Sequence, residues 1–337
     1  MDTATTLHDR IRHTINSRTK PPGSLGLLEA LAVQIAVLQS TIAPRMERCT
    51  LIIFAADHGI ARAGVSAFPQ AVTRQMVLNF LSGGAAANVF ARSVGVDLQV
   101  VDAGVAGAPI ENPGLIRRRL GAGTANFLDA PAMSPEQAAR ALDDGAAIAR
   151  ATAGEALAFG EMGIGNTATA AALAHKLTGL PLERLVGRGA GLDDAALARK
   201  LSTLQRACAR VPGILPAERA MAEYGGFEIV MMAGAMRAGA QAGRLVLVDG
   251  FIATAAASLA LALDPTVRPA LVFAHRSVEA GHGVLLDRLR ARPLLDLEMR
   301  LGEGTGALLA WPLVQAASRM MTEMASFAEA GVSNGAA

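Results

Sequence analysis

The sequence has few cysteines, few aromatic side chains and no long apolar segment. Its two cysteines, Cys49 and Cys208, lie far apart and outside any CxxC pattern, which argues against a disulfide framework or a zinc knuckle and predicts two core thiols. Aromatic residues make up only 4% of the 337 residues, and the net charge of +2 comes from basic residues that are scattered apart from 117–119. A nucleic-acid partner is therefore not expected.

The longest uncharged apolar stretch, 250–263, is shorter than the roughly 20 residues that a membrane span needs, so no membrane partner is expected. The first ten residues lack a basic start followed by an apolar block. We therefore expect no secretory signal and a cytoplasmic location. A hydrophobic content of 52% is enough for a sizeable core, and no linker-like composition divides the chain into halves.

Apolar runs of strand length alternate with helical patterns along most of the chain. The run Cys49–Ala56 has no in-out alternation, which is typical of a parallel strand covered on both faces. Acids follow several such runs, as at Asp57, Asp102 and Asp249. The pattern predicts an α/β fold with an open, mostly parallel sheet and helices on both faces, and ligands of such sheets bind at the carboxyl edge. The two helical end segments are expected to pack together.

A glycine-spaced turn lies between the apolar stretch at 158–162 and an alanine-rich helix. A strand, a Gly-x-Gly turn and a helix amino terminus form an anion site, because free N–H groups point at the ligand. The turn 163–167 is therefore interpreted as a phosphate monoester site or as a plain tight turn. It matches neither the P-loop nor the dinucleotide fingerprint, so an oxidoreductase ranks low. A second glycine cluster at 187–191 suggests a ligand with phosphate and sugar parts.

Glu303 lies between glycines, just before a helix expected from Ala307. Such a carboxylate is presented to a ligand rather than packed, and the helix start would place N–H groups beside it; the alternative is an ordinary loop glutamate. Ser66, Phe68 and Met76 would suit a flat apolar ligand with a polar edge, unless they are merely loop and core residues.

Three other polar side chains have two interpretations each. Lys20 is either a solvated lysine or a cation that reaches a phosphate, and Lys200 is either a solvated helix lysine or a site residue. His58 follows the first strand without a second metal ligand at a suitable local spacing, so a hydrogen-bonding role is favoured over a metal site. Ser24 and Ser134 are each expected to cap the helix that follows.

Seven segments together resemble the nicotinate-nucleotide:dimethylbenzimidazole phosphoribosyltransferases of cobalamin lower-ligand synthesis. The match runs in order from about residue 19 to residue 320. Each motif alone is weak, but their common order makes chance a poor explanation. The segments are Thr19–Gly26, Ala55–Gly59, Val65–Gln70, Gly160–Thr167, Gly187–Gly191, Val248–Phe251 and Arg300–Gly306.

The resemblance implies transfer of 5-phosphoribose from nicotinate mononucleotide to 5,6-dimethylbenzimidazole, giving α-ribazole 5′-phosphate and nicotinate with inversion. It implies that Glu303 is the base, with a pKa raised by burial, and that Glu161 and Lys200 are catalytic or ribose-contacting partners. It places the azole at Ser66, Phe68, Met76 and Leu301, the phosphate at Gly163, Gly189 and Ser277, and further substrate contacts at Asn166 and Thr167.

The resemblance also implies a small helical domain from 1–30 and 307–337, a large Rossmann-like catalytic domain over 31–306, and a homodimer. No cofactor and no metal are expected. Two alternatives stay open at this stage. One is a related phosphoribosyltransferase with another acceptor, such as adenine, another benzimidazole or a phenol. The other is a non-catalytic nucleotide sensor on the same fold.

Overall fold

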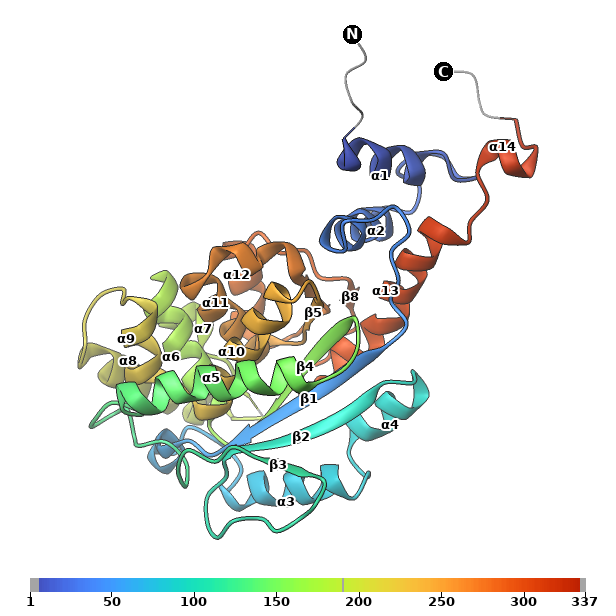
Figure 1. The fold of residues 1–337 in the computed structure, drawn as a ribbon. Coiled ribbons are helices and arrows are strands. Elements are labelled where there is room, and N and C mark those ends of the chain that lie inside the picture. Colours follow the sequence, from blue (N-terminus) through green and yellow to red (C-terminus); the bar gives the residue numbers. More distant parts are fainter. Residues whose placement is uncertain (1–5, 190, 334–337) are drawn as a thin grey trace.

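A six-stranded, wholly parallel sheet forms the centre of the protein in a computed structural model that describes residues 6–189 and 191–333 (Figure 1). The spatial order is β3-β2-β1-β4-β5-β6. The strands are β1 (Cys49–Ala56), β2 (Asp97–Gly104), β3 (Leu115–Arg117), β4 (Ala156–Met162), β5 (Leu245–Val248) and β6 (Leu271–Phe273). This order reverses direction between β1 and β4, the point at which doubly wound sheets bind ligands.

Every residue of β1 is buried, because β1 is central and helices cover both faces of the sheet. Alternate side chains enter two separate cores: Ile52 and Phe54 join one, and Leu51 and Ile53 join the other. Within the sheet, Ile53 pairs with Val100 of β2 and with Gly160 of β4. The expectation of a strand covered on both faces is confirmed, and so is the α/β fold class.

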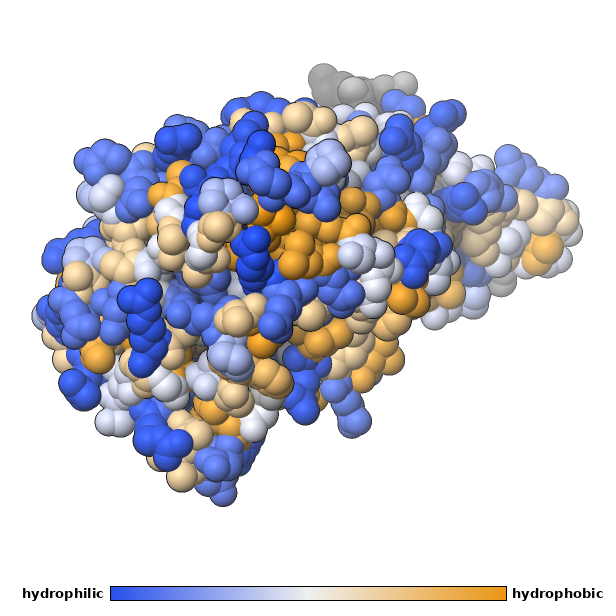
Figure 2. All heavy atoms as spheres, turned by 90° about the horizontal axis from the view of Figure 1, so that it is seen from below, coloured by the Kyte–Doolittle hydropathy of each residue, from blue (hydrophilic) through white to orange (hydrophobic). Residues whose placement is uncertain are grey.

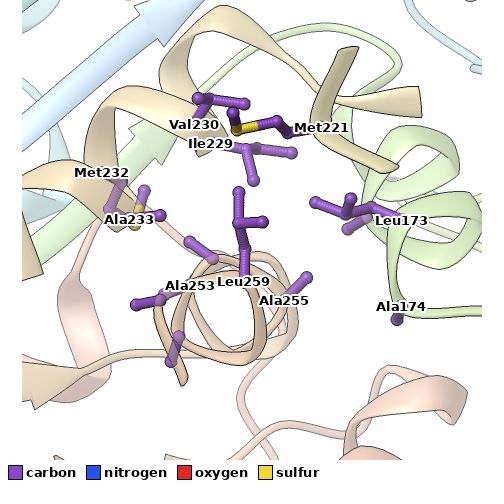
Figure 3. Close-up of a cluster of buried hydrophobic side chains, with 14 of the residues drawn as sticks. Leu173, Ala174, Met221, Ile229, Val230, Met232, Ala233, Ala253, Ala255 and Leu259 are labelled. Carbon is purple, nitrogen blue, oxygen red and sulfur yellow. The ribbon is translucent and has the colours of Figure 1, made fainter. Parts of the chain in front are cut away.

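The larger core contains helices that are apolar almost all round. Figure 3 shows Leu259 of α11 directed toward Ile229 of α10, with Leu173 of α6 beside them. Helices of this kind bury every face only because small residues, mostly alanine and glycine, let neighbouring backbones approach. The helices of this side are α5 (Pro135–Ala151), α6 (Asn166–Thr178), α7 (Leu182–Leu185), α8 (Asp194–Ala209), α9 (Ala217–Tyr224), α10 (Phe227–Gln241), α11 (Phe251–Leu263) and α12 (Ala280–Arg288).

The second core lies between the opposite face of the sheet and helices from both ends of the chain. These helices are α1 (Leu7–Asn16), α2 (Leu27–Leu38), α3 (Ala71–Leu81), α4 (Ala86–Ser93) and α13 (Thr305–Thr322). The remaining elements are small. They are the short helix α14 (Phe327–Ala330), a two-stranded sheet of β7 (His275–Arg276) and β8 (Leu295–Asp296), and 3-10 turns at Gly59–Ala63 and Pro265–Ala270.

The two ends of the chain are tied together by backbone hydrogen bonds (Figure 1). Thr19 N–H donates to the carbonyl of Ala325, and Phe327 N–H donates to that of Ser17, each at 3.0 Å. The expected contact between the helical ends is therefore confirmed. The division into two domains stays a prediction: residue 306 lies within α13, which contacts α2 at the chain ends as well as α4 and β4.

Two local predictions near the amino end are wrong. Ser24 does not cap the second helix, which begins at Leu27 after Gly26 and has no side-chain cap. Lys20 is neither solvated nor free to reach a phosphate, because its ammonium group lies 2.8 Å from the Glu29 carboxylate and only 6% of the residue is exposed. By contrast, Ser134 caps α5 in a reciprocal capping box with Gln137, as its sequence predicts.

Both cysteines are buried and free, as expected of core thiols. Over the described residues, no helix combines the length and the apolar character that a bilayer crossing requires.

Candidate active site

A cavity of about 840 Å³ opens at the carboxyl ends of β4 and β5. It brings together residues from several separate segments of the chain, which is what the topology of the sheet predicts for a ligand site. Eleven of the twelve site residues expected from the sequence line it: Ser66, Phe68, Met76, Glu161, Gly163, Asn166, Thr167, Gly189, Ser277, Leu301 and Glu303. The twelfth, Lys200, lies behind the wall and contacts Thr167.

Glu303 is held in a left-handed backbone conformation. Its φ is +61°, and Gly302 and Gly304 on either side have φ values of +85° and +80°. Close packing fixes this bend, because a Cβ atom on Gly160 would lie 2.5 Å from the carbonyl carbon of Glu303. A non-glycine residue in this region carries strain that the surrounding structure must hold, and such strain clusters at functional sites.

The carboxylate of Glu303 is almost wholly buried, with 6% of the residue exposed. Burial raises its pKa, the nearby Asp249 carboxylate raises it further, and a hydrogen bond from the amide of Ala87 opposes both. The Ala87 amide lies 3.4 Å from Oε2, so this bond is long. A raised pKa is what a carboxylate needs to accept a proton near neutral pH.

The sequence suggested that amide groups at the start of α13 lie beside Glu303 and donate to it. In the structure, the carboxylate of Glu303 accepts from the amide of Ala87 instead. The helix begins at Thr305, and the Ala307 amide donates to Oδ1 of Asp249 at 3.0 Å. Asp249, at the end of β5, is 2% exposed and lines the cavity. The helix terminus therefore anchors a different carboxylate, and Glu303 takes its one amide donor from α4.

Glu161 lies at the end of β4, directly against the Glu303 bend. A Cβ atom on Gly302 would come within 2.3 Å of its Oε1, and Asn166 donates a side-chain hydrogen bond to its Oε2. Burial raises the pKa of Glu161 to about 8, and the charges of Asp249, Glu228 and Glu303 add to the shift. Like charges in a buried site disfavour joint ionisation, so Glu161 keeps its proton at neutral pH.

Lys200 projects from α8 toward the two glycine turns and is 1% exposed. Its ammonium group donates to Oγ1 of Thr167 at 2.9 Å and to the carbonyl of Gly187 at 3.0 Å. Burial lowers its pKa to about 8, against an opposing contribution from Glu279. The interpretation of Lys200 as a solvated helix lysine is therefore wrong.

The turn 163–165 lies on a buried polar support. A Cβ atom on Gly163 would lie 2.3 Å from the carbonyl oxygen of Ala56 and 2.9 Å from Nε2 of His58, so only glycine fits. His58 forms a buried pair with Glu228 at 2.7 Å, and its Nδ1 lies 2.9 Å from Oγ1 of Thr169. Both ring nitrogens are thus engaged in hydrogen bonds, as the sequence favoured. No three His, Cys, Asp or Glu side chains in the described segments are arranged to hold a metal ion.

The wall formed by Ser66, Phe68, Met76 and Leu301 is mainly apolar. Phe68 is 48% exposed and Leu301 is 58% exposed, which is unusual for side chains of this size. The Ser66 hydroxyl accepts a hydrogen bond of 3.3 Å from the Phe68 amide, which closes the loop between them. This part of the cavity can hold a flat aromatic ring against an apolar surface.

Sequence reasoning missed several polar residues of the cavity, among them Asp249, His275 and Glu279. His275 places its Nε2 3.6 Å from Oδ1 of Asp249. A signal was present for two of them, since Asp249 follows one strand and His275 follows another, and such positions meet at the carboxyl edge of a sheet. No sequence pattern marked Glu279 as a site residue, because its contact partner, Gly189, lies 90 residues away in the chain.

Comparisons with known proteins agree on one family. A family model described as a phosphoribosyltransferase matches residues 2–332. The chain is 53% identical over 334 residues to the nicotinate-nucleotide–dimethylbenzimidazole phosphoribosyltransferase of Dechloromonas aromatica (strain RCB), covering 97% of this chain and 96% of that one. It is 54% identical over 330 residues to the protein of the same name from Ralstonia nicotianae (strain ATCC BAA-1114 / GMI1000), covering 96% and 93%.

The crystal structure of CobT from Thermus thermophilus has the same fold. It superposes with a TM-score of 0.94 at 47% sequence identity, over 98% of this chain and 99% of that one. The chain therefore belongs to the nicotinate-nucleotide–dimethylbenzimidazole phosphoribosyltransferase family.

Proposed function

We propose that this enzyme transfers the 5-phosphoribosyl group from nicotinate mononucleotide to 5,6-dimethylbenzimidazole, giving α-ribazole 5′-phosphate and nicotinate. The observation that carries the proposal is the convergence of three features in one cavity. These are the buried base candidate Glu303, the apolar wall around Phe68, and the glycine turns at Gly163 and Gly189. Each supports one part of the reaction: proton removal, azole binding and phosphate binding.

In the proposed step, one ring nitrogen of the azole attacks the anomeric carbon of the ribose. The bond from that carbon to the pyridinium nitrogen breaks, and its electron pair leaves with nicotinate. The proton on the second azole nitrogen passes to Glu303, whose pKa is raised by burial. Because attack comes from the face opposite the leaving group, the β configuration becomes α. The enzyme supplies orientation and a positioned base, since the leaving group is already cationic.

The charges around the cavity favour such a substrate. Four carboxylates line it, from Glu161, Asp249, Glu279 and Glu303. Negative groups around the reacting centre stabilise a pyridinium ring and the positive charge that develops on the ribose in the transition state. We assign Glu161 to supporting the Glu303 bend, because Asn166 fixes it directly beside that bend and burial raises its pKa to about 8, so that it carries a proton at neutral pH.

The phosphate is assigned to the part of the cavity formed by the two glycine turns and Ser277. Gly163, Gly189 and Ser277 bring backbone and hydroxyl groups there, and Thr167 stands between them and the ammonium group of Lys200. Lys200 supports the glycine turn through the Gly187 carbonyl and places a positive charge close to the anion. Binding of the phosphate there would set the position of the anomeric carbon relative to Glu303.

The deciding experiment is incubation of the purified protein with nicotinate mononucleotide and dimethylbenzimidazole, with both products measured by chromatography. We expect release of nicotinate that depends on the azole, together with α-ribazole 5′-phosphate. In Glu303→Gln, which keeps the size of the side chain but cannot accept the proton, we expect kcat to fall by about 10²–10⁴. Tight binding of the nucleotide without nicotinate release would instead support a sensor.

A related acceptor is the second candidate, and the exposure of Phe68 favours it. A half-exposed aromatic side chain at the rim restrains a flat base less tightly than an enclosed pocket does. A panel of adenine, benzimidazole and phenol acceptors, compared by kcat/KM, would rank the alternatives. Dimethylbenzimidazole is expected to lead this ranking.

The homodimer that the resemblance implies stays a prediction, as does the cytoplasmic location. Figure 2 shows a continuous apolar area on the face seen from below, bordered by hydrophilic residues. Large exposed apolar areas on soluble domains commonly mark contact surfaces. Light scattering on the purified protein should give twice the mass of the 34.6 kDa chain.

A further inference from the structure

The carboxylate of Glu279 occupies the part of the cavity assigned to the phosphate. Its Oε1 accepts a hydrogen bond of 3.3 Å from the amide of Gly189. A Cβ atom on Gly187 would lie 2.2 Å from the same oxygen, so the carboxylate rests directly on the backbone of the glycine turn. The amide of Glu279 donates to Oγ of Ser277 at 3.2 Å. Glu279 thus engages both Gly189 and Ser277, two of the three residues assigned to the phosphate.

The side chain of Glu279 does not cap the helix that it precedes. Glu279 is the N-cap residue of α12, yet its side chain makes no cap hydrogen bond to its own helix. Serine, threonine, aspartate and asparagine are the residues that ordinarily cap a helix with their side chains, whereas the longer glutamate side chain can reach farther away. Here the carboxylate instead reaches a loop 90 residues away in the chain. The carboxylate of Glu279 therefore accepts from the amide of Gly189 rather than from an amide of its own helix.

Positive charge reaches the same loop from the other side. Lys200 donates to the carbonyl of Gly187, and Glu279 accepts from the amide of Gly189, so the ammonium and the carboxylate hold opposite ends of one turn. The attraction between these two charges is weakened when the carboxylate leaves. A second anion that took its place would restore it.

A phosphate and a carboxylate cannot share one amide donor, because like charges at that distance repel. We propose that Glu279 and the 5′-phosphate of the substrate compete for the amide of Gly189, that phosphate binding displaces the carboxylate, and that Glu279 thereby limits how tightly phosphate esters are held. This inference rests on the proposed function. Since substrate and product both carry the 5′-phosphate, the same carboxylate would assist product release when it returns to Gly189.

The test uses Glu279→Gln, which keeps the shape and one acceptor oxygen but removes the charge. Inorganic phosphate is the probe, measured by calorimetry and as a competitive inhibitor at constant ionic strength. We expect phosphate to bind about fivefold more tightly or better, the effect of about 1 kcal/mol for two unit charges about 4 Å apart in water. KM for nicotinate mononucleotide should fall by a similar factor, while KM for the azole stays as it was.

Glu183→Gln is the matched control, because it makes the same chemical change on the exposed surface of α7, outside the cavity. Its phosphate affinity should equal that of the parent. Unchanged or weaker phosphate binding in Glu279→Gln would overturn the inference and make Glu279 a support of the turn. A crystal of the parent soaked in phosphate gives an independent answer: Glu279 still bound to Gly189, with phosphate elsewhere, also overturns it.

The two proposals fail in different ways. A parent enzyme that releases nicotinate but shows neither tighter phosphate binding in Glu279→Gln nor displacement in the crystal would contradict only the inference about Glu279. A parent that binds phosphate at Gly189 and releases no nicotinate would contradict the proposed transfer and leave the displacement in place.

Discussion

The ammonium group of Lys200 lies 2.9 Å from Oγ1 of Thr167, and this contact joins a lysine behind the cavity wall to a residue that lines the cavity. It explains how a side chain that is 1% exposed can act on a ligand. The hydroxyl of Thr167 accepts from Lys200 and can donate its own proton onward to an anion. A chain of hydrogen bonds of this kind makes Thr167 a better donor.

Thr167→Val should weaken binding of nicotinate mononucleotide by about tenfold, because a hydrogen bond to a charged group contributes about 1.5–3 kcal/mol. Lys200→Met should weaken it at least as much.

The pKa of Lys200 is lowered to about 8, so its charge is present below that pH and lost above it. Affinity of the parent should therefore fall as pH rises through about 8. KM measured from about pH 6.5 to about pH 9.5 tests this, and Lys200→Met should lack the fall.

Asp249→Asn should shift the acidic limb of the pH–rate profile to lower pH. Glu303 must be ionised to accept a proton, so activity falls as pH drops through its pKa, which burial and then the charge of Asp249 raise. Removing that charge lowers the pKa of Glu303 and extends activity to more acidic conditions. The profile of kcat/KM for the azole, measured in parent and variant, gives the shift. An acidic limb at the same pH in both proteins would show that Asp249 does not influence the pKa of Glu303.

Gly302→Ala should nearly abolish activity, and Gly107→Ala should not. Both glycines have φ of +85°, so both alanines carry the same backbone strain of about 1–2 kcal/mol. Only at Gly302 would the new methyl group collide with Glu161, 2.3 Å from Oε1, whereas the space around Gly107 is open. Chemical denaturation of the two variants measures the effect of backbone strain on stability, and kcat measures the effect of displacing Glu161 on activity. Equal losses of activity would mean that the position of Glu161 is unimportant.

Glu161→Gln should make stability less dependent on pH. Burial raises the folded-state pKa of Glu161 to about 8 from a usual 4.5, so the folded protein holds a proton that the unfolded chain has released over this range. The stabilisation from this proton is complete below about pH 4.5 and is lost as pH rises through about 8. Urea unfolding at about pH 5.5 and about pH 8.5 should show a drop in the parent, smaller in Glu161→Gln. The exposed Glu218→Gln is the control, with a drop equal to that of the parent.

Phe68→Ala should raise KM for dimethylbenzimidazole severalfold and leave KM for the nucleotide almost unchanged. Phe68 is half exposed on the apolar wall, so its loss removes contact area for a ring without opening the core. Leu78→Ala, on the neighbouring helix and outside the cavity lining, removes a similarly exposed side chain and serves as the comparison. A rise in KM for the nucleotide instead would place the azole elsewhere.

Much of this architecture could be predicted from the order of the residues. Strand-length apolar runs predicted the parallel sheet, and acids directly after them marked its ligand-binding edge. Glycine turns and the resemblance named the residues that line the cavity. Partnerships between distant segments were not predictable, because periodicity and local spacing carry no information about them. Lys20 was misjudged for a more local reason, since its partner Glu29 becomes its neighbour only after the turn between them folds.

The same limit explains why Glu279 and the support of Gly163 were missed. The pair of His58 and Glu228 joins residues 170 positions apart, and both side chains are wholly buried. No pattern in the sequence predicts that two such residues contact each other. Their effect on the site is visible only in the folded structure, where His58, together with the carbonyl oxygen of Ala56, fills the space that any side chain at residue 163 would need.

Helix α13 runs for 18 residues, about 27 Å, from the Glu303 bend to the paired chain ends. At its far end, the guanidinium group of Arg18 donates to the carbonyls of Met321 and Met324. The helix thus connects the Glu303 bend at the cavity to the paired ends of the chain. We therefore expect chimeras that exchange only these terminal segments with those of a relative to change turnover, although the exchanged residues lie outside the cavity lining.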